Sequence, residues 1–247
     1  MDGRKDFIYF EEKKIAFSDC DFTGRMKLSA LLRYTSDLAG NDYADRGMNW
    51  EFLQQQGVAF LVSSVRMRIH RPIVEEESVT FSTYERGVKG PICLRDIFVE
   101  DAAGNRVISG RSAWILCDPI KRRILRPDTD RLPKSIESHW DMPLECDDPA
   151  RIRLPEMMEN IGERAVVYSD IDANGHVNNS VYADIACDFL PLDVLKSGIT
   201  EFSVFYHQEA TLGDRIAMSV GVDPGRVVVR GKNGSAVCFE LEAYGNF

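Results

Sequence analysis

Three polar residues that can take part in acid–base chemistry or hydrogen bonding alternate along one short segment of the chain: Asp172, Asn174 and His176. An extended segment directs alternate side chains to the same face, so we expect these three to line one wall. Gly175 lies between the last two, and a glycine lets the backbone turn or come close to a ligand. The spacing therefore predicts a small polar site.

The residues after this segment predict a helix. Either Asn178 or Asn179 can offer a side-chain oxygen that caps a helix N-terminus, and we expect the helix over about 179–190. His176 would then lie just before the first turn of the helix, where backbone N–H groups favour developing negative charge. This position would suit a side chain that stabilises an anion.

The same segment has a counterpart near the start of the chain. Residues 17–29 align without a gap with residues 168–180, at an offset of 151 positions. Similarity at a long fixed offset indicates two copies of one structural unit. Thr23 stands opposite Asn174 and Arg25 opposite His176, although a lone histidine or an Asn-Gly pair can equally be structural. Since the first copy makes the same turn without them, the fold does not require Asn or His there.

A second correspondence follows at a shorter offset. Residues 69–72 can be aligned with residues 206–209, at an offset of 137 positions. This alignment places Pro72 where the second half has Glu209. The first half thus lacks an imidazole, an amide and a carboxylate at matching positions, which favours a division of labour. We expect the second half to carry the chemistry and the first half to serve structure.

The segment from Ser169 to Tyr182 resembles the signature of the acyl-acyl carrier protein thioesterases, which include the plant plastid enzymes and bacterial relatives. Weaker similarities lie at 25–26, 47–50 and 206–209. The resemblance implies two tandem hotdog folds and the release of a free fatty acid from its carrier protein, with no cofactor. It also implies that the catalytic positions are Asp172, Asn174, His176 and Glu209. Some family members have a cysteine after the glutamate; here Ala210 excludes a thiol nucleophile at that place.

These four side chains can hydrolyse a thioester without a metal or a redox cofactor. Glu209 is the candidate base for the attacking water, and such a base typically contributes about 10²–10⁴ in rate. Asn174 and His176 can donate N–H groups to the oxyanion or to the leaving sulfur. Asp172 either orients one of these groups or attacks the carbonyl carbon to form a transient anhydride. The sequence leaves both routes open.

Other functions remain compatible with the same fold. Hotdog proteins include acyl-CoA thioesterases and hydratases that act on acyl thioesters. A non-catalytic acyl-binding module is a further alternative, and it would bind acyl thioesters without turning them over. The sequence does not reveal the length or saturation of the acyl chain. Further dimerisation is also open, because the internal duplication can satisfy the pairing of hotdog units within one chain.

The periodicity of apolar residues predicts the elements that position the site. In the first half we expect a strand at 7–17, helices at 27–46 and 50–56, and strands at 60–70, 78–88, 92–99 and 106–117. The second half repeats this order with a strand at 163–168, the helix, and strands at 199–207, 215–222, 226–231 and 236–244. Between the halves, prolines at 127, 133, 143, 149 and 155 punctuate a polar stretch.

The resulting fold class is α+β, with two copies of an antiparallel sheet wrapped round a long helix that pack as an internal pseudo-dimer. We expect a non-catalytic first unit with the acyl-chain pocket at 1–126, a linker at 127–160 and the catalytic unit at 161–247. The helix at 27–46 and residues 60–62 are apolar enough to line that pocket.

Composition restricts the partners. The 247 residues carry a net charge of −9, which argues against general nucleic-acid binding. We see no signal peptide and no run of about 20 apolar residues, so we expect a cytoplasmic protein without a membrane span. The six cysteines are scattered and predict free thiols. An acidic carrier protein would need a local basic patch; the candidates are Arg66, Arg68, His70 and Arg71 on one strand, and Lys121, Arg122, Arg123 and Arg126.

Overall fold

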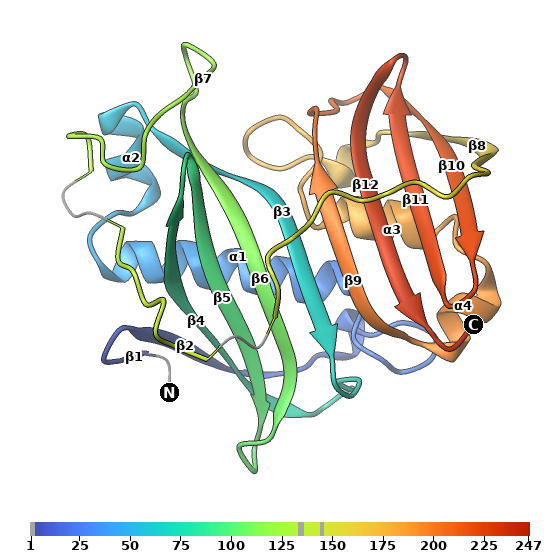
Figure 1. Cartoon of the computed structure of the whole chain (residues 1–247), viewed down its shortest axis with the longest axis horizontal. Coiled ribbons are helices and arrows are strands. Elements are labelled where there is room, and N and C mark those ends of the chain that lie inside the picture. Colours follow the sequence, from blue (N-terminus) through green and yellow to red (C-terminus); the bar gives the residue numbers. More distant parts are fainter. Residues whose placement is uncertain (1–2, 133–135, 144–145) are drawn as a thin grey trace.

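The computed structural model describes residues 3–132, 136–143 and 146–247. Twelve strands within these ranges form one antiparallel sheet, in the order β1-β2-β4-β5-β6-β3-β9-β12-β11-β10-β8, with β7 paired to β6 (Figure 1). The strands are β1 (Gly3–Lys5), β2 (Ile8–Lys14), β3 (Ala59–Ile69), β4 (Ser78–Lys89), β5 (Ile92–Asp101), β6 (Arg106–Asp118), β7 (Arg123–Ile124), β8 (Glu159–Ala165), β9 (Ile199–Tyr206), β10 (Arg215–Asp223), β11 (Arg226–Asn233) and β12 (Ala236–Gly245).

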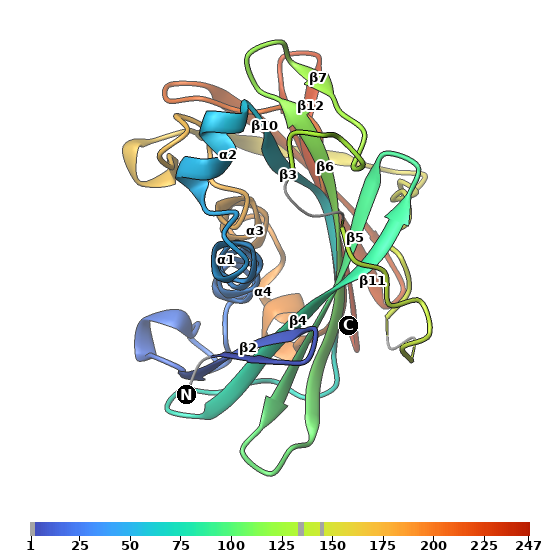
Figure 2. The ribbon, with the colours of Figure 1, turned by 90° about the vertical axis from the view of Figure 1, so that its left-hand side faces the viewer.

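The helices cover one face of the sheet, as Figure 2 shows. They are α1 (Leu28–Asp45), α2 (Trp50–Gln56), α3 (Val181–Cys187) and α4 (Leu192–Ser197). The apolar side of α1 is buried, as its spacing predicted; Leu31, Leu38 and Ala39 are almost fully covered. Within the described ranges, no helix combines the length and the apolar character needed to cross a membrane.

The two halves share one continuous sheet. β3 of the first half pairs with β9 of the second, and Arg66 and Arg68 of β3 both bind the carboxylate of Glu201 on β9, at 2.5 and 3.1 Å. On the helical side, the Ser29 hydroxyl of α1 donates to Asp184 of α3 at 2.5 Å. Two sheet-and-helix units joined in this way confirm the predicted α+β fold of two tandem hotdogs.

Matching backbone contacts in the two halves confirm the internal repeat. Arg25 forms an isolated β-bridge with Val74, and His176 forms the equivalent bridge with Thr211. The next residues repeat the pattern: the Met26 N–H donates to the Ile73 carbonyl, and the Val177 N–H to the Ala210 carbonyl, both at 2.9 Å. In each pair of contacts, the first partners are 151 positions apart and the second partners 137, which are the two offsets found in the sequence. Pro72 is therefore the structural counterpart of Glu209.

A long segment between β7 and β8, which we call the strap (residues 125–158), contains no helix or strand where it is described. Figure 1 shows it crossing the sheet on the face opposite the helices. The Arg86 side chain donates to the carbonyl oxygens of Trp140 and Met142, and Cys146 and Ile152 are buried. The strap therefore covers part of the sheet. Pro133, one of the prolines that marked this segment, lies outside the described residues.

Three predicted elements that flank the two repeated segments have other boundaries in the structure. In place of the single helix expected at 179–190, α3 ends at Cys187. Pro191 cannot continue it, and the chain starts a new helix, α4, at Leu192. The strand expected at 163–168 is β8, which ends at Ala165. Its last expected residues form a 3₁₀ turn, Tyr168–Asp170, held by the Val167 N–H donating to the Asp170 carboxylate at 2.8 Å. The strand expected at 7–17 ends earlier, at Lys14.

Candidate active site

The segment with alternating polar residues is a tight turn, and the prediction that it is extended is wrong. The Gly175 N–H donates to the Asp172 carbonyl at 3.0 Å, and the Asp172 N–H donates to the His176 carbonyl at 2.9 Å. Gly175 has a φ of 83°, a left-handed conformation that favours glycine. The turn leaves Asn174 exposed at its tip, whereas Asp172 and His176 at its base are half-buried. The three side chains therefore do not form one flat wall.

The Asp172 carboxylate holds this turn together. Its Oδ1 accepts the backbone N–H of Asn174 at 2.8 Å, a local hydrogen bond that aspartate commonly makes in turns. In the first half, Asp21 Oδ1 accepts the N–H of Thr23 at 2.7 Å in the same way. Since the half without His and Glu makes the same bond, this contact serves the shape of the turn in both halves.

His176 and Glu209 come together as predicted. The bridge between His176 and Thr211 aligns the two segments, and His176 Nε2 lies 3.4 Å from Glu209 Oε2. The imidazole is 32% exposed and the carboxylate 50% exposed, so both reach solvent. A partly exposed imidazole beside a carboxylate can exchange protons with a bound water. No polar contact of the Asn174 side chain is found within the described residues.

A cation from the first half also lies at the site and was not predicted there. Arg122 Nη2 lies 3.7 Å from Glu209 Oε2. Arg122 belongs to the turn between β6 and β7. We call residues 119–124 the tongue, and Figure 1 shows β7 projecting beyond the ends of the neighbouring strands. The sequence marked Arg122 only as part of a basic run. No local pattern reports a contact between residues so far apart in the chain.

The Cys117 thiol, on which the charge of Glu209 acts, is not prepared for nucleophilic attack. Burial, and then the negative charges of Asp118 and Glu209, raise the pKa of Cys117. A raised pKa keeps the thiol protonated, and the thiolate is the nucleophilic form. Ala210 itself is fully buried, and its N–H donates to the Tyr182 hydroxyl at 3.2 Å. Within the described residues, no group of three or more His, Cys, Asp or Glu side chains could hold a metal ion.

The helix after the site begins later than predicted, at Val181 instead of about 179, and His176 lies five residues before it. α3 begins at Val181, beyond His176, and its N-cap residue, Ser180, makes no side-chain cap bond. Asn178 instead accepts the N–H and the hydroxyl of Ser180, at 2.9 and 2.7 Å. The helix is only seven residues long. The site therefore relies on side chains more than on a helix end.

The first half uses the equivalent positions for contact between the halves. Arg25, at the position of His176, donates from Nη1 to the Lys196 carbonyl at the end of α4, at 3.1 Å. Its guanidinium also lies against Gly198. Pro72 stands at the position of Glu209 and carries no carboxylate. The first half has therefore no counterpart of the His–Glu pair and has a structural cation instead.

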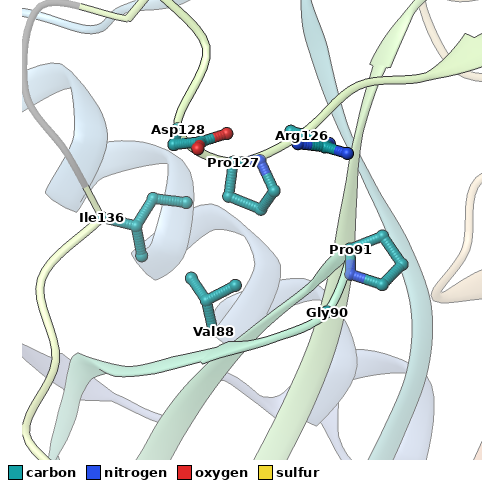
Figure 3. A pocket seen from close by; sticks show the side chains of 7 residues that line it. All are labelled: Val88, Gly90, Pro91, Arg126, Pro127, Asp128 and Ile136. Atoms are coloured by element: carbon teal, nitrogen blue, oxygen red, sulfur yellow. The ribbon is translucent and has the colours of Figure 1, made fainter.

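A pocket of about 580 Å³ lies in the first half, next to the end of the β4–β5 hairpin (Figure 3). Val88 and Ile136 approach each other across it, and Pro127 and Arg126 of the strap form another side. Residues 60–62 do not line it, and Phe60 instead stacks on Tyr43 of α1 at 4.7 Å between ring centroids. None of the four predicted catalytic residues lines it either.

Comparison with known proteins identifies relatives of the whole chain. A model of the acyl-ACP thioesterase N-terminal domain matches residues 7–132, and a model of the C-terminal domain of the same family matches residues 156–237. No curated protein matches the sequence. An acyl-ACP thioesterase from Bacteroides thetaiotaomicron shares the fold, with a TM-score of 0.88 and 23% identity over 97% of this chain and 98% of that one. The 12:0-ACP thioesterase of Umbellularia californica has a TM-score of 0.79 and 15% identity over 98% of both chains.

Proposed function

The chain belongs to the acyl-ACP thioesterase family, because the two family models together match most of its length, and we propose that it releases free fatty acids from acyl carrier protein (ACP) with Glu209 and His176 at the reacting centre. The observation that carries the proposed site is the approach of His176 Nε2 to Glu209 Oε2, at 3.4 Å, on the half that keeps both residues. The first half, with Arg25 and Pro72 in their place, makes the same turn without this pair.

In the proposed reaction Glu209 takes a proton from a water molecule whose oxygen attacks the thioester carbonyl carbon. The carbonyl oxygen becomes an oxyanion, to which the His176 ring N–H and the Asn174 amide can donate. When the tetrahedral intermediate collapses, the C–S bond breaks and the carrier leaves as a thiol that receives the proton held at the site. The products are one carboxylic acid and one free thiol for each water consumed.

The sequence left two routes open, attack by water and attack by Asp172 with a transient anhydride, and the geometry favours attack by water. One oxygen of Asp172, Oδ1, is engaged in the turn, where it accepts the Asn174 N–H at 2.8 Å and fixes the orientation of the carboxylate. The same bond exists in the first half, where no reaction is expected. We therefore assign Asp172 the role of holding the turn that carries Asn174 and His176.

Substituting Asp172 tests this assignment. In Asp172→Asn the side-chain carbonyl can still accept the Asn174 N–H, so we expect kcat on an acyl-ACP substrate to stay within about threefold of the wild type. In Asp172→Ala the acceptor is lost, and we expect kcat to fall about tenfold as the turn loosens. If Asp172→Asn instead lost 100-fold or more with an unchanged melting temperature, the carboxylate would take part in the chemistry and the anhydride route would gain support.

We propose that the first half receives the acyl chain. Glu209 is close enough to the first half for its charge to act on Cys117 of β6. Cys117 pairs with Ala59 at the start of β3, next to Phe60. An acyl chain leaving the His–Glu pair would thus meet apolar surface of the first half.

The tongue is the proposed docking surface for the carrier. Of the two basic patches considered, the one on β3 is neutralised, since Arg66 and Arg68 bind Glu201, and Arg71 binds Glu77 and Asp101. On the tongue and just after it, Lys121, Arg123 and Arg126 are exposed, and no ion pair of theirs is found within the described residues. Ile120 is 87% exposed and Ile124 58% exposed beside them. A basic and apolar projection beside Glu209 suits an acidic carrier that delivers its acyl arm there.

An assay with three substrates tests both the function and the docking surface. We expect the purified protein to release fatty acid and free thiol in equal amounts from acyl-ACP, with kcat/KM falling about tenfold between low salt and about 0.5 M salt. Acyl-CoA and an acyl-N-acetylcysteamine thioester should be turned over with a lower kcat/KM, and the neutral thioester should show little salt dependence. Charge reversal by Lys121→Glu and Arg123→Glu should raise KM for acyl-ACP about tenfold and leave the neutral thioester unaffected.

Arg151→Glu provides the matched control, because Arg151 is an exposed cation on the strap. It changes the net charge as much as either tongue variant and should leave KM for acyl-ACP unchanged. Salt-independent turnover of acyl-ACP would exclude the tongue as a docking surface. A preference for acyl-CoA would favour the related activity on coenzyme A thioesters, and tight binding without turnover would indicate an acyl-binding module.

A further inference from the structure

The apex of the tongue has an unusual backbone for the residue that occupies it. Arg122 has a φ of 47°, in the left-handed region that favours glycine and disfavours side chains with a Cβ atom. The turn is closed on its other side by the Lys121 N–H, which donates to Asp118 Oδ1 at 2.9 Å. A disfavoured conformation that is held by its surroundings points to a role for the side chain.

The side chain at this apex reaches Glu209. Arg122 Nη2 lies 3.7 Å from Glu209 Oε2, and His176 Nε2 lies 3.4 Å from the same oxygen. Two nitrogen atoms from different halves thus lie near one carboxylate oxygen. No polar partner of the other oxygen, Oε1, is found within the described residues. This arrangement turns one oxygen toward the protein and leaves the other for a water molecule.

We infer that Arg122 is a positioning residue for Glu209, contributed by the half that lacks catalytic residues. The inference rests on the proposed role of Glu209 as the base. The guanidinium fixes the rotation of the carboxylate by attracting Oε2, so that Oε1 faces the attacking water. Arg122 itself touches neither the water nor the thioester. Its neighbours Lys121 and Arg123 carry the same charge and make no contact with Glu209, so proximity distinguishes Arg122 from the docking residues around it.

The variant Arg122→Gly tests this role without endangering the fold, because glycine suits the left-handed backbone. We expect its melting temperature to equal or exceed that of the wild type. On a short neutral thioester, which needs no carrier docking, kcat should fall about two- to fivefold, the range of an exposed ion pair, with KM unchanged. Arg122→Lys keeps a cation and should restore at least half of the kcat that Arg122→Gly loses. Arg151→Gln removes a charge from an exposed cation of the strap, away from the proposed docking surface, and should have wild-type kcat on this substrate.

Each outcome separates the role of Arg122 from the proposed function. Wild-type kcat in Arg122→Gly, while Glu209→Gln is inactive, would overturn the positioning role and leave Glu209 as the base. An equal loss in Arg122→Gly and Arg151→Gln would also overturn it, because the effect would then come from the net charge of the protein. If Glu209→Gln itself were active, the proposed function of Glu209 would fail, irrespective of Arg122.

Discussion

Glu209→Gln is expected to lower kcat by about 10²–10⁴ on every thioester substrate, with KM changed little. The amide has the shape of the carboxylate but cannot accept a proton from the attacking water. The side chain is 50% exposed and its two polar contacts, to His176 and Arg122, are longer than hydrogen bonds. The fold should therefore tolerate the change, and single-turnover kinetics will show whether the chemical step is the one that slows.

A control for this variant lies in the same half. Glu163 on β8 is 52% exposed and has one cationic partner, Arg215, at 2.9 Å. Glu163→Gln removes the same charge at a comparable exposure and should turn over at the wild-type rate. Near-normal turnover of Glu209→Gln would remove Glu209 from the mechanism, and a comparable loss in both variants would indicate a general effect of charge.

His176→Ala should produce the second large effect, a fall in kcat of about 10²–10³, the cost of losing one donor to an oxyanion. In His176→Gln a side-chain N–H remains, and we expect a smaller loss of about tenfold. The comparison of the two variants reports on hydrogen-bond donation, because alanine removes the donor and glutamine keeps one. Rates measured at saturating short thioester avoid any influence of carrier docking.

His207 supplies the control for the histidine variants. It lies close in sequence to Glu209, but its Nε2 contacts Glu240 at 3.2 Å. His207→Gln should keep the wild-type kcat. Equal losses in His176→Ala and His176→Gln would contradict a donor role and indicate instead that the imidazole acts in proton transfer.

Most of the fold was predictable because its elements are long and periodic. The helix expected at 27–46 is α1, Leu28–Asp45, and the strand expected at 78–88 is β4, Ser78–Lys89. β1 and β7 were not predicted, because strands of three and two residues are too short to show an alternation of apolar and polar side chains. α4 was missed because its six residues follow a proline at the end of an expected helix.

The site was predictable only where the two halves could be compared. The repeat singled out His176 and Glu209, and the structure brings them to 3.4 Å. The alternation argument failed for Asn174 because it assumed an extended backbone, while Gly175 closes a turn. Arg122 was identified as a charge but not as a neighbour of Glu209, because that contact depends on the position of the tongue relative to the second half in the folded chain.

The β3–β9 pairing also determines how the protein comes apart. If the chain were cut in the strap and the halves separated, β3 and β9 would each become the edge strand of a smaller sheet. The N–H and C=O groups that pair the two strands in the intact sheet would then be unpaired. Buried apolar side chains, Met67 on β3 and Phe202 on β9, would become exposed at the same edges. Such edges recruit other strands, so the separate halves should aggregate. Because neither half can leave the other without that exposure, heat should unfold the intact chain in one cooperative transition.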